Sequence, residues 1–208
     1  MNYAHKLVLV QPALSLYVPD NELVKPTYEW LLAKNAATAF PFWAKIWPAA
    51  KAMADFLGAE EHYIKNKRVI EIGAGIGLPS FAIAQHTAEI IISDYATEAV
   101  ALIEKNITYL GLKNAKAMCL DWNDFPTNIK ADIVLLSDIN YAPNDFNALQ
   151  NLIQRFLAQG STIIIATPQR ITASPFVEKL QAYIKHKALQ NVLEANGTVD
   201  ISLLILSL

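Results

Sequence analysis

From Arg68 onward, short apolar runs alternate with amphipathic segments, and this alternation constrains the fold more than any other feature. Strands are expected at residues 68–73, 89–94, 115–122, 131–138 and 161–168, and helices at residues 78–86, 96–110, 144–159 and 173–186. Strands separated by helices predict a parallel α/β sheet with right-handed crossovers. Such a sheet is covered on both faces, which accounts for the hydrophobic fraction of 53%.

The two ends of the chain depart from this alternation. Asn196-Gly197 lies between two strand-like runs and predicts an antiparallel hairpin, because this dipeptide favours turns with positive φ. Residues 1–66 precede the alternation and are expected to form an N-terminal cap packed on the core. Residues 67–208 would form that core, within one compact domain.

Composition narrows the class of protein. The net charge of −2 gives no general attraction to nucleic acid, so no nucleic-acid partner is expected. The only cysteine, Cys119, excludes an intramolecular disulfide and is expected to be buried in its strand, and the four histidines have no metal-ligand spacing. No leader peptide or bilayer-spanning run is recognised, so we expect a cytoplasmic protein without a membrane partner. The sequence does not indicate the oligomeric state.

The first strand ends in a glycine-rich loop, "EIGAGIGLP", with Gly73, Gly75 and Gly77. Glycine permits a sharp turn and a close approach of a ligand to the backbone. A dinucleotide-binding loop would carry a third glycine where Leu78 stands. Glu71 would repel a pyrophosphate and suits a ligand that carries positive charge. A simple tight turn is the alternative interpretation.

Two further strand ends carry candidate binding residues, Asp94 and the pair Asp121-Trp122. An acid about twenty residues after a glycine loop is typical of a ribose-binding residue. The alternative for Asp94 is a helix N-cap. Asp121 could accept a hydrogen bond from an adenine amino group while Trp122 offers a ring face, or the two could be a turn aspartate and a half-buried ring.

Together, "EIGAGIG", "SDY" and "LDW" resemble the binding motifs of the class I, seven-strand S-adenosylmethionine-dependent methyltransferases. The resemblance implies a Rossmann-like doubly wound seven-stranded sheet in the order 3-2-1-4-5-7-6, with the last strand antiparallel, and S-adenosylmethionine as cofactor. The cofactor-binding residues that it implies are Trp47, Glu71, Gly73, Gly75, Gly77, Asp94, Tyr95, Asp121, Trp122 and Ser137.

The fourth strand ends in "SDINYAP", so that Asp138 and Tyr141 form a D-x-x-Y pattern. This pattern resembles the D-x-x-Y/F motif of the methyltransferase-like protein-lysine methyltransferases, a group that includes nicotinamide-N-methyltransferase-like proteins. The resemblance implies that Asp138 and Tyr141 lie at the methyl-transfer site and that Tyr141 also contacts the substrate. No metal is implied.

Trp43 and Trp47 precede the glycine loop in "FPFWAKIWPAA". Pro48 disfavours a helical conformation at the residue before it and can open the next helix, so we expect an extended or turning segment. Trp47 is expected at the methionine end of the cofactor and Trp43 nearer the substrate. Core packing is the alternative for both rings.

The expected function is N-methylation, most simply of a protein lysine. A lysine amine must be neutral to accept a methyl group, and a nearby carboxylate favours its charged form. The expected role of Asp138 is therefore to orient the amine. A small-molecule amine acceptor and a cofactor-binding module without turnover are the alternatives.

Overall fold

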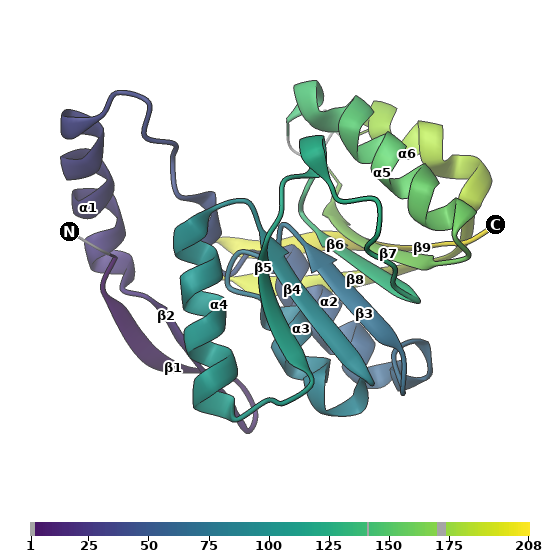
Figure 1. The fold of residues 1–208 in the computed structure, drawn as a ribbon, viewed down its shortest axis with the longest axis horizontal. Coiled ribbons are helices and arrows are strands. Elements are labelled where there is room, and N and C mark those ends of the chain that lie inside the picture. The colour runs from purple at the N-terminus through teal and green to yellow at the C-terminus, as the bar shows by residue number, and fades with distance from the viewer. Residues whose placement is uncertain (1–2, 141, 170–173) are drawn as a thin grey trace.

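The computed structural model describes residues 3–140, 142–169 and 174–208 and contains a seven-stranded sheet between two layers of helices (Figure 1). The strands of this sheet are β3 (Arg68–Ile72), β4 (Glu89–Asp94), β5 (Ala115–Cys119), β6 (Ile133–Ser137), β7 (Thr162–Pro168), β8 (Ile184–Glu194) and β9 (Gly197–Leu206). They lie in the order β5-β4-β3-β6-β7-β9-β8, with β3 to β7 parallel and β9 antiparallel to both neighbours. The predicted α/β sheet with an antiparallel last strand is confirmed.

The helices divide between the two faces of the sheet. One layer holds α2 (Pro48–Ala59), α3 (Leu78–Ile83) and α4 (Thr97–Leu110), and the other holds α5 (Phe146–Ala158) and α6 (Ser174–Leu180). Alternate residues of a strand face opposite sides, so Val69 packs in the core of the first layer while Ile70 and Ile72 pack in that of the second. Both faces of β3 are thereby buried, as its apolar sequence predicts.

The N-terminal residues form two parts that pack differently. The hairpin β1 (His5–Gln11) and β2 (Leu14–Pro19) and the helix α1 (Asn21–Lys34) lie beside α4, whereas α2 packs directly on the main sheet (Figure 1). The buried Asn106 of α4 fastens β2 by accepting from the Tyr17 N–H at 2.7 Å and donating to the Tyr17 carbonyl at 2.9 Å. Tyr17 thus gains the pair of backbone hydrogen bonds that a neighbouring strand would supply. The division at residue 66 stays a prediction.

The C-terminal elements differ from their predicted bounds. The helix predicted to reach residue 186 ends at Leu180, and β8 begins at Ile184 because its backbone pairs with β9. The hairpin is present, but Glu194 pairs with Gly197, so its turn lies one residue earlier than predicted. Pairing with β7 and burial of the inward-facing residues of β9 fix this register.

Cys119 is exposed, and the prediction that it would be buried is wrong. It is the last residue of β5, which forms an edge of the sheet. An apolar run in sequence does not reveal which strand lies at an edge, where fewer neighbours cover the side chains.

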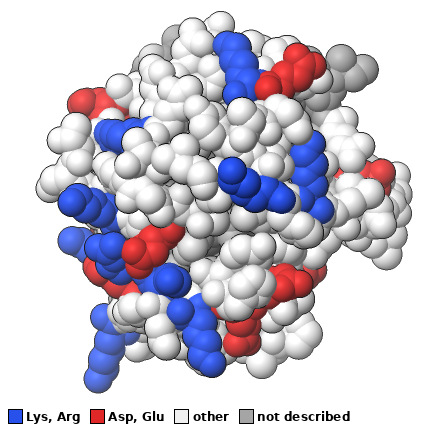
Figure 2. All heavy atoms as spheres, turned by 90° about the vertical axis from the view of Figure 1, so that its right-hand side faces the viewer, with Lys and Arg blue, Asp and Glu red and all other residues white. Residues whose placement is uncertain are grey.

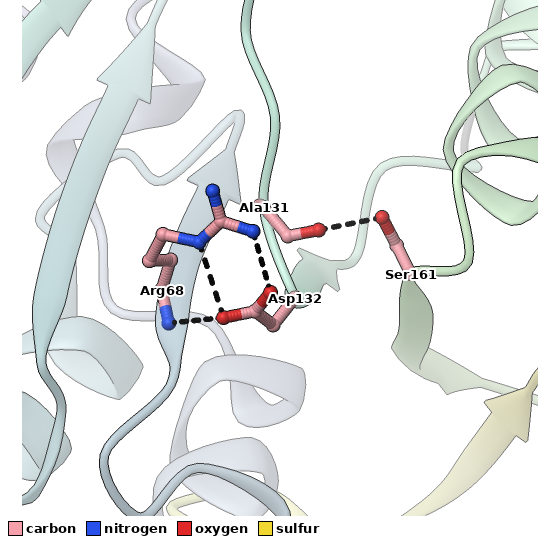
Figure 3. Close-up of polar contacts among 4 residues, drawn as sticks. All are labelled: Arg68, Ala131, Asp132 and Ser161. Atoms are coloured by element: carbon pink, nitrogen blue, oxygen red, sulfur yellow. Dashed lines mark hydrogen bonds and ion pairs between the residues drawn. The ribbon is translucent and has the colours of Figure 1, made fainter.

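The strands β3, β6 and β7 are joined by polar contacts where they begin (Figure 3). The Arg68 guanidinium donates to both carboxylate oxygens of Asp132, at 2.7 and 3.3 Å, and the Ser161 hydroxyl donates to the Ala131 carbonyl at 2.6 Å. These groups stabilise the amino ends of the strands. The carboxyl ends of the strands, where α/β sheets bind ligands, lie at the opposite end of the sheet.

The surface carries charge of both signs. On the face drawn in Figure 2, basic and acidic side chains are intermixed in small groups, and uncharged surface lies between the groups. Among the described residues, the helices are all too short or too polar to cross a membrane.

Candidate active site

A cavity lies at the carboxyl ends of β3, β4 and β6, walled on its other side by residues 42–50. It brings together most of the residues that the sequence singled out, which are Trp43, Trp47, Gly73, Gly75, Gly77, Asp94, Tyr95, Trp122, Ser137 and Asp138. They come from segments as far apart as residues 43 and 138, because parallel strands deliver their carboxyl ends to one edge of the sheet.

The glycine loop forms a cradle that has no room for side chains. Gly73, Gly75 and Gly77 have φ values of +68°, +57° and +80°. A Cβ atom at Gly75 would lie 3.1 Å from the Trp43 carbonyl oxygen, and one at Gly73 would lie 3.2 Å from the Trp122 ring. The bare backbone therefore fits both the left-handed turns and the close packing, which agrees with a ligand that lies directly on the loop.

Asp94 links the glycine loop to the turn that follows β4. One carboxylate oxygen accepts from the Gly75 N–H at 2.8 Å and the other accepts from the Ala96 N–H at 2.9 Å. Burial raises the pKa of this carboxyl, and the backbone hydrogen bonds oppose that rise. The carboxylate keeps a lone pair that could accept from a ligand hydroxyl. Asp94 therefore orders the turn before α4 and also lines the cavity.

Glu71 is fully buried but does not line the cavity. Its Oε2 accepts from both the backbone N–H and the hydroxyl of Ser80 in α3, whereas Oε1 has no hydrogen-bond partner among the described residues. Burial raises the pKa of Glu71 to about 7. Because the carboxylate lies beneath α3, its influence on a cationic ligand would be through the electric field. Its role in holding the cofactor stays a prediction.

We expect the Glu71 carboxyl to make the protein less stable as the pH rises from 4.5 to about 7. In this window the unfolded chain has released the proton that the folded chain still holds, so the free energy of unfolding falls. Glu71→Gln removes this titration. The free energy of unfolding of the variant minus that of wild type should therefore increase by on the order of 3 kcal/mol as the pH rises across this window.

Urea unfolding of both proteins across this pH range measures the difference. Glu89→Gln, at an exposed position where β4 begins, is the matched control and should follow the wild-type profile. Parallel profiles for wild type and Glu71→Gln would contradict the assignment of this titration to Glu71.

Asp121 and Trp122 separate in the structure. The exposed Asp121 caps a short 3-10 turn, where its Oδ1 accepts from the backbone N–H of Asn123 at 2.8 Å, and it does not line the cavity. The half-buried Trp122 does line the cavity and packs near Gly73. The turn interpretation therefore describes Asp121, and its contact with adenine stays a prediction.

Asp138 follows β6 and lines the cavity with only 8% of its surface exposed. Its φ of 55° is in the left-handed region, which few residues with a side chain adopt, although Asp and Asn adopt it more readily than most. Its N–H donates to the Ala166 carbonyl of β7 at 2.9 Å, which fixes this conformation. Tyr141, predicted beside it, lies outside the described residues. Strained backbone of this kind is concentrated at functional sites.

Trp43 and Trp47 both line the cavity, although the two rings are held differently. Trp43 is buried in the core and packs edge-to-face on Tyr3 at a centroid distance of 5.1 Å. Trp47 adopts an extended conformation before Pro48, which opens α2, and its indole N–H donates to the Phe42 carbonyl at 2.9 Å. The predicted turning segment is confirmed. Trp43 therefore belongs to the hydrophobic core and also lines the cavity.

Lys45 and Ile139 also line the cavity, although no sequence motif indicated them. The Lys45 ammonium lies 4.6 Å from the centre of the Trp47 ring, and a Cβ at Gly73 would touch Ile139 at 3.2 Å. Their only signal in the sequence is that Lys45 lies between Trp43 and Trp47 and that Ile139 follows Asp138. Within the described part of the chain, no group of three or more His, Cys, Asp or Glu residues could hold a metal ion.

The sheet and its glycine cradle define the class I S-adenosylmethionine-dependent methyltransferase fold, with an acid at the end of β4 and another after β6. A family model described as lysine methyltransferase matches residues 31–183, and the chain belongs to this family. S-adenosylmethionine is accordingly its cofactor, and the uncovered glycine backbone beside Asp94 suits such a ligand.

Several curated relatives agree with this family. The chain is 30% identical over 166 residues to the calmodulin-lysine N-methyltransferase of Arabidopsis thaliana, covering 74% of this chain and 54% of that protein. It is also 30% identical to the protein N-lysine methyltransferase METTL21A of Danio rerio, covering 75% and 74%, and to the histone-arginine methyltransferase METTL23 of Xenopus laevis, covering 55% and 51%. The chain spans about half the length of the calmodulin-lysine N-methyltransferase and of METTL23.

Among solved structures, the N-methyltransferase NodS of Bradyrhizobium japonicum in complex with S-adenosyl-L-homocysteine matches with a TM-score of 0.63. The match covers 86% of this chain and 98% of NodS at 14% sequence identity. At this identity the likeness concerns the fold alone.

Proposed function

We propose that this chain transfers a methyl group from S-adenosylmethionine to the side-chain amine of a protein lysine. The observation that carries the proposal is a buried carboxylate, Asp138, in the wall of the same cavity as the glycine cradle. Membership of the lysine methyltransferase family supports the choice of acceptor. The cofactor supplies an activated methyl group on a sulfonium, which an amine displaces in line.

In this proposal the protein mainly aligns the amine and excludes water. The acceptor must first lose a proton, which for a free lysine costs about 4.6 kcal/mol at pH 7. The apolar walls formed by Trp43, Trp47 and Ile139 would lower the pKa of the amine by desolvation. Asp138 has the opposite effect on that pKa, so its role is to accept a hydrogen bond from the amine and direct the lone pair toward the methyl group.

The location and the partner belong to the same proposal. The substrate is a protein, and the reaction takes place in the cytoplasm. The single cysteine, Cys119, cannot form an intramolecular disulfide, which agrees with a compartment where disulfides are rare. The two competing functions are methylation of a small-molecule amine and cofactor binding without turnover, and the test below separates them.

Labelled S-adenosylmethionine incubated with the purified protein and an extract of cells that lack it tests the proposal. We expect a labelled protein band that yields methyl-lysine on hydrolysis and is absent with Asp138→Asn. Label on arginine or histidine would overturn the acceptor, and label only in small molecules would favour the small-molecule amine. Absence of any label despite measured cofactor binding would identify a non-catalytic module.

A further inference from the structure

A second concavity adjoins the cofactor cavity. It lies between the end of α1, residues 35–43 and the first turn of α4. Figure 1 shows α1 beside α4 on the side of the molecule away from α5 and α6. Trp43 and Tyr95 line both hollows, so the two lie side by side and share a wall. A polypeptide that places one side chain in the cofactor cavity can therefore lay neighbouring residues in the second hollow.

The walls of the second concavity are aromatic on one side and acidic on the other. Tyr3, Phe40 and Trp43 contribute rings, and Tyr3 and Trp43 hold each other edge-to-face. Glu98, in the first turn of α4, is the one charged residue among the described residues that line this hollow. Its side chain is exposed, and its Oε2 accepts from the Thr97 hydroxyl at 3.2 Å. Within the described residues it forms no ion pair.

Tyr95, which lines both hollows, lies near several carboxylates. The pKa of Tyr95 is raised, first by burial and then by nearby carboxylates, which are Asp94, Asp121, Asp145 and Glu98. Among the described residues, the charged groups that raise this pKa are all acids, although Lys45 lies in the wall of the adjoining cofactor cavity. A cationic segment would be attracted to the wall and an anionic one repelled.

We propose that the second concavity binds the substrate residues next to the acceptor lysine, and that Glu98 selects a lysine or arginine side chain among them. Aromatic walls suit the alkyl stem of such a side chain, and a carboxylate suits its charged end. The inference rests on the proposed function for the identity of the occupant. It adds a preference for basic sequence around the target, which the methyl-transfer site alone does not require.

The test is a binding measurement that needs no turnover. The full chain loaded with S-adenosyl-L-homocysteine is titrated with two short peptides, each with one central lysine, flanked either by arginines or by glutamates. Wild type should prefer the arginine peptide, and Glu98→Gln should weaken its binding about fivefold, as expected for a partly exposed ion pair. The effect should shrink in 0.5 M salt because salt screens exposed charges.

Glu104→Gln is the matched control, since Glu104 is exposed on the same helix and lies outside the second concavity. It should bind both peptides as wild type does. Equal losses in the two variants, no preference between the peptides, or no peptide binding at all would each overturn the inference. The labelled-extract experiment is independent of these outcomes, so protein-lysine methylation could stand while the role of Glu98 fails.

Discussion

Gly75→Ala is expected to weaken S-adenosylmethionine binding about 100-fold, which corresponds to about 3 kcal/mol. The new Cβ would lie 3.1 Å from the carbonyl oxygen of Trp43, a backbone atom that cannot move as a side-chain tip does. The φ of +57° adds strain for any residue with a side chain. The loop would relieve the contact by moving away from Trp43, and cofactor binding would have to reverse that movement.

Gly111→Ala is the control that separates the effect of backbone strain from that of the steric contact. Gly111 ends α4 with a φ of +63°, but a Cβ there would meet no atom within 4 Å. This variant should lose stability through backbone strain and keep its cofactor affinity. Calorimetric titration with S-adenosylmethionine measures both proteins. Equal affinities in Gly75→Ala and wild type would refute the assignment of the glycine loop to the cofactor.

Asp138→Asn is expected to reduce methyl transfer at least 100-fold, the order of loss that follows a misplaced reacting group. Asparagine tolerates the left-handed conformation at φ 55° and has the same shape, so the fold should persist. The amide also donates hydrogen bonds, and it therefore no longer holds the amine lone pair toward the methyl group. Cofactor affinity should change little, since the glycine loop and Asp94 remain.

Asp132→Asn makes the same chemical change at the other end of β6, where Asp132 pairs with Arg68. Because this pair is partly exposed, its loss should cost little stability and should leave methyl transfer unchanged. Single-turnover transfer and cofactor titration distinguish the two steps. If Asp138→Asn loses cofactor affinity as much as transfer, Asp138 belongs to cofactor binding instead.

Residues at the end of a strand or directly after it were the most predictable part of the site. Gly73, Asp94 and Asp138 follow apolar runs whose length and composition identify strands, and parallel strands present their carboxyl ends together. These residues therefore line one cavity. Trp43 and Trp47 were also predictable as a turning segment, because Pro48 restricts the residue before it.

The direction of individual side chains was less predictable. Glu71 is in a predicted strand, yet its carboxylate hydrogen-bonds to Ser80 beneath α3 and does not reach the cavity wall. Asp121 satisfies its own turn through Asn123. A carboxylate can bond to a ligand or to a nearby protein group. The outcome depends on where the following helix or turn lies, and the spacing of the motif does not encode that position.

The sequence by itself determined the alternating α/β order, the glycine loop, and the acids at successive strand ends. These features follow from local periodicity and turn chemistry, which act over a few neighbouring residues. Only the tertiary structure decided that Cys119 ends an edge strand, that Glu71 is buried behind the cavity, and that Tyr3, Phe40 and Glu98 form a second hollow beside it. Burial and adjacency arise from packing between segments distant in the chain, so no local pattern records them.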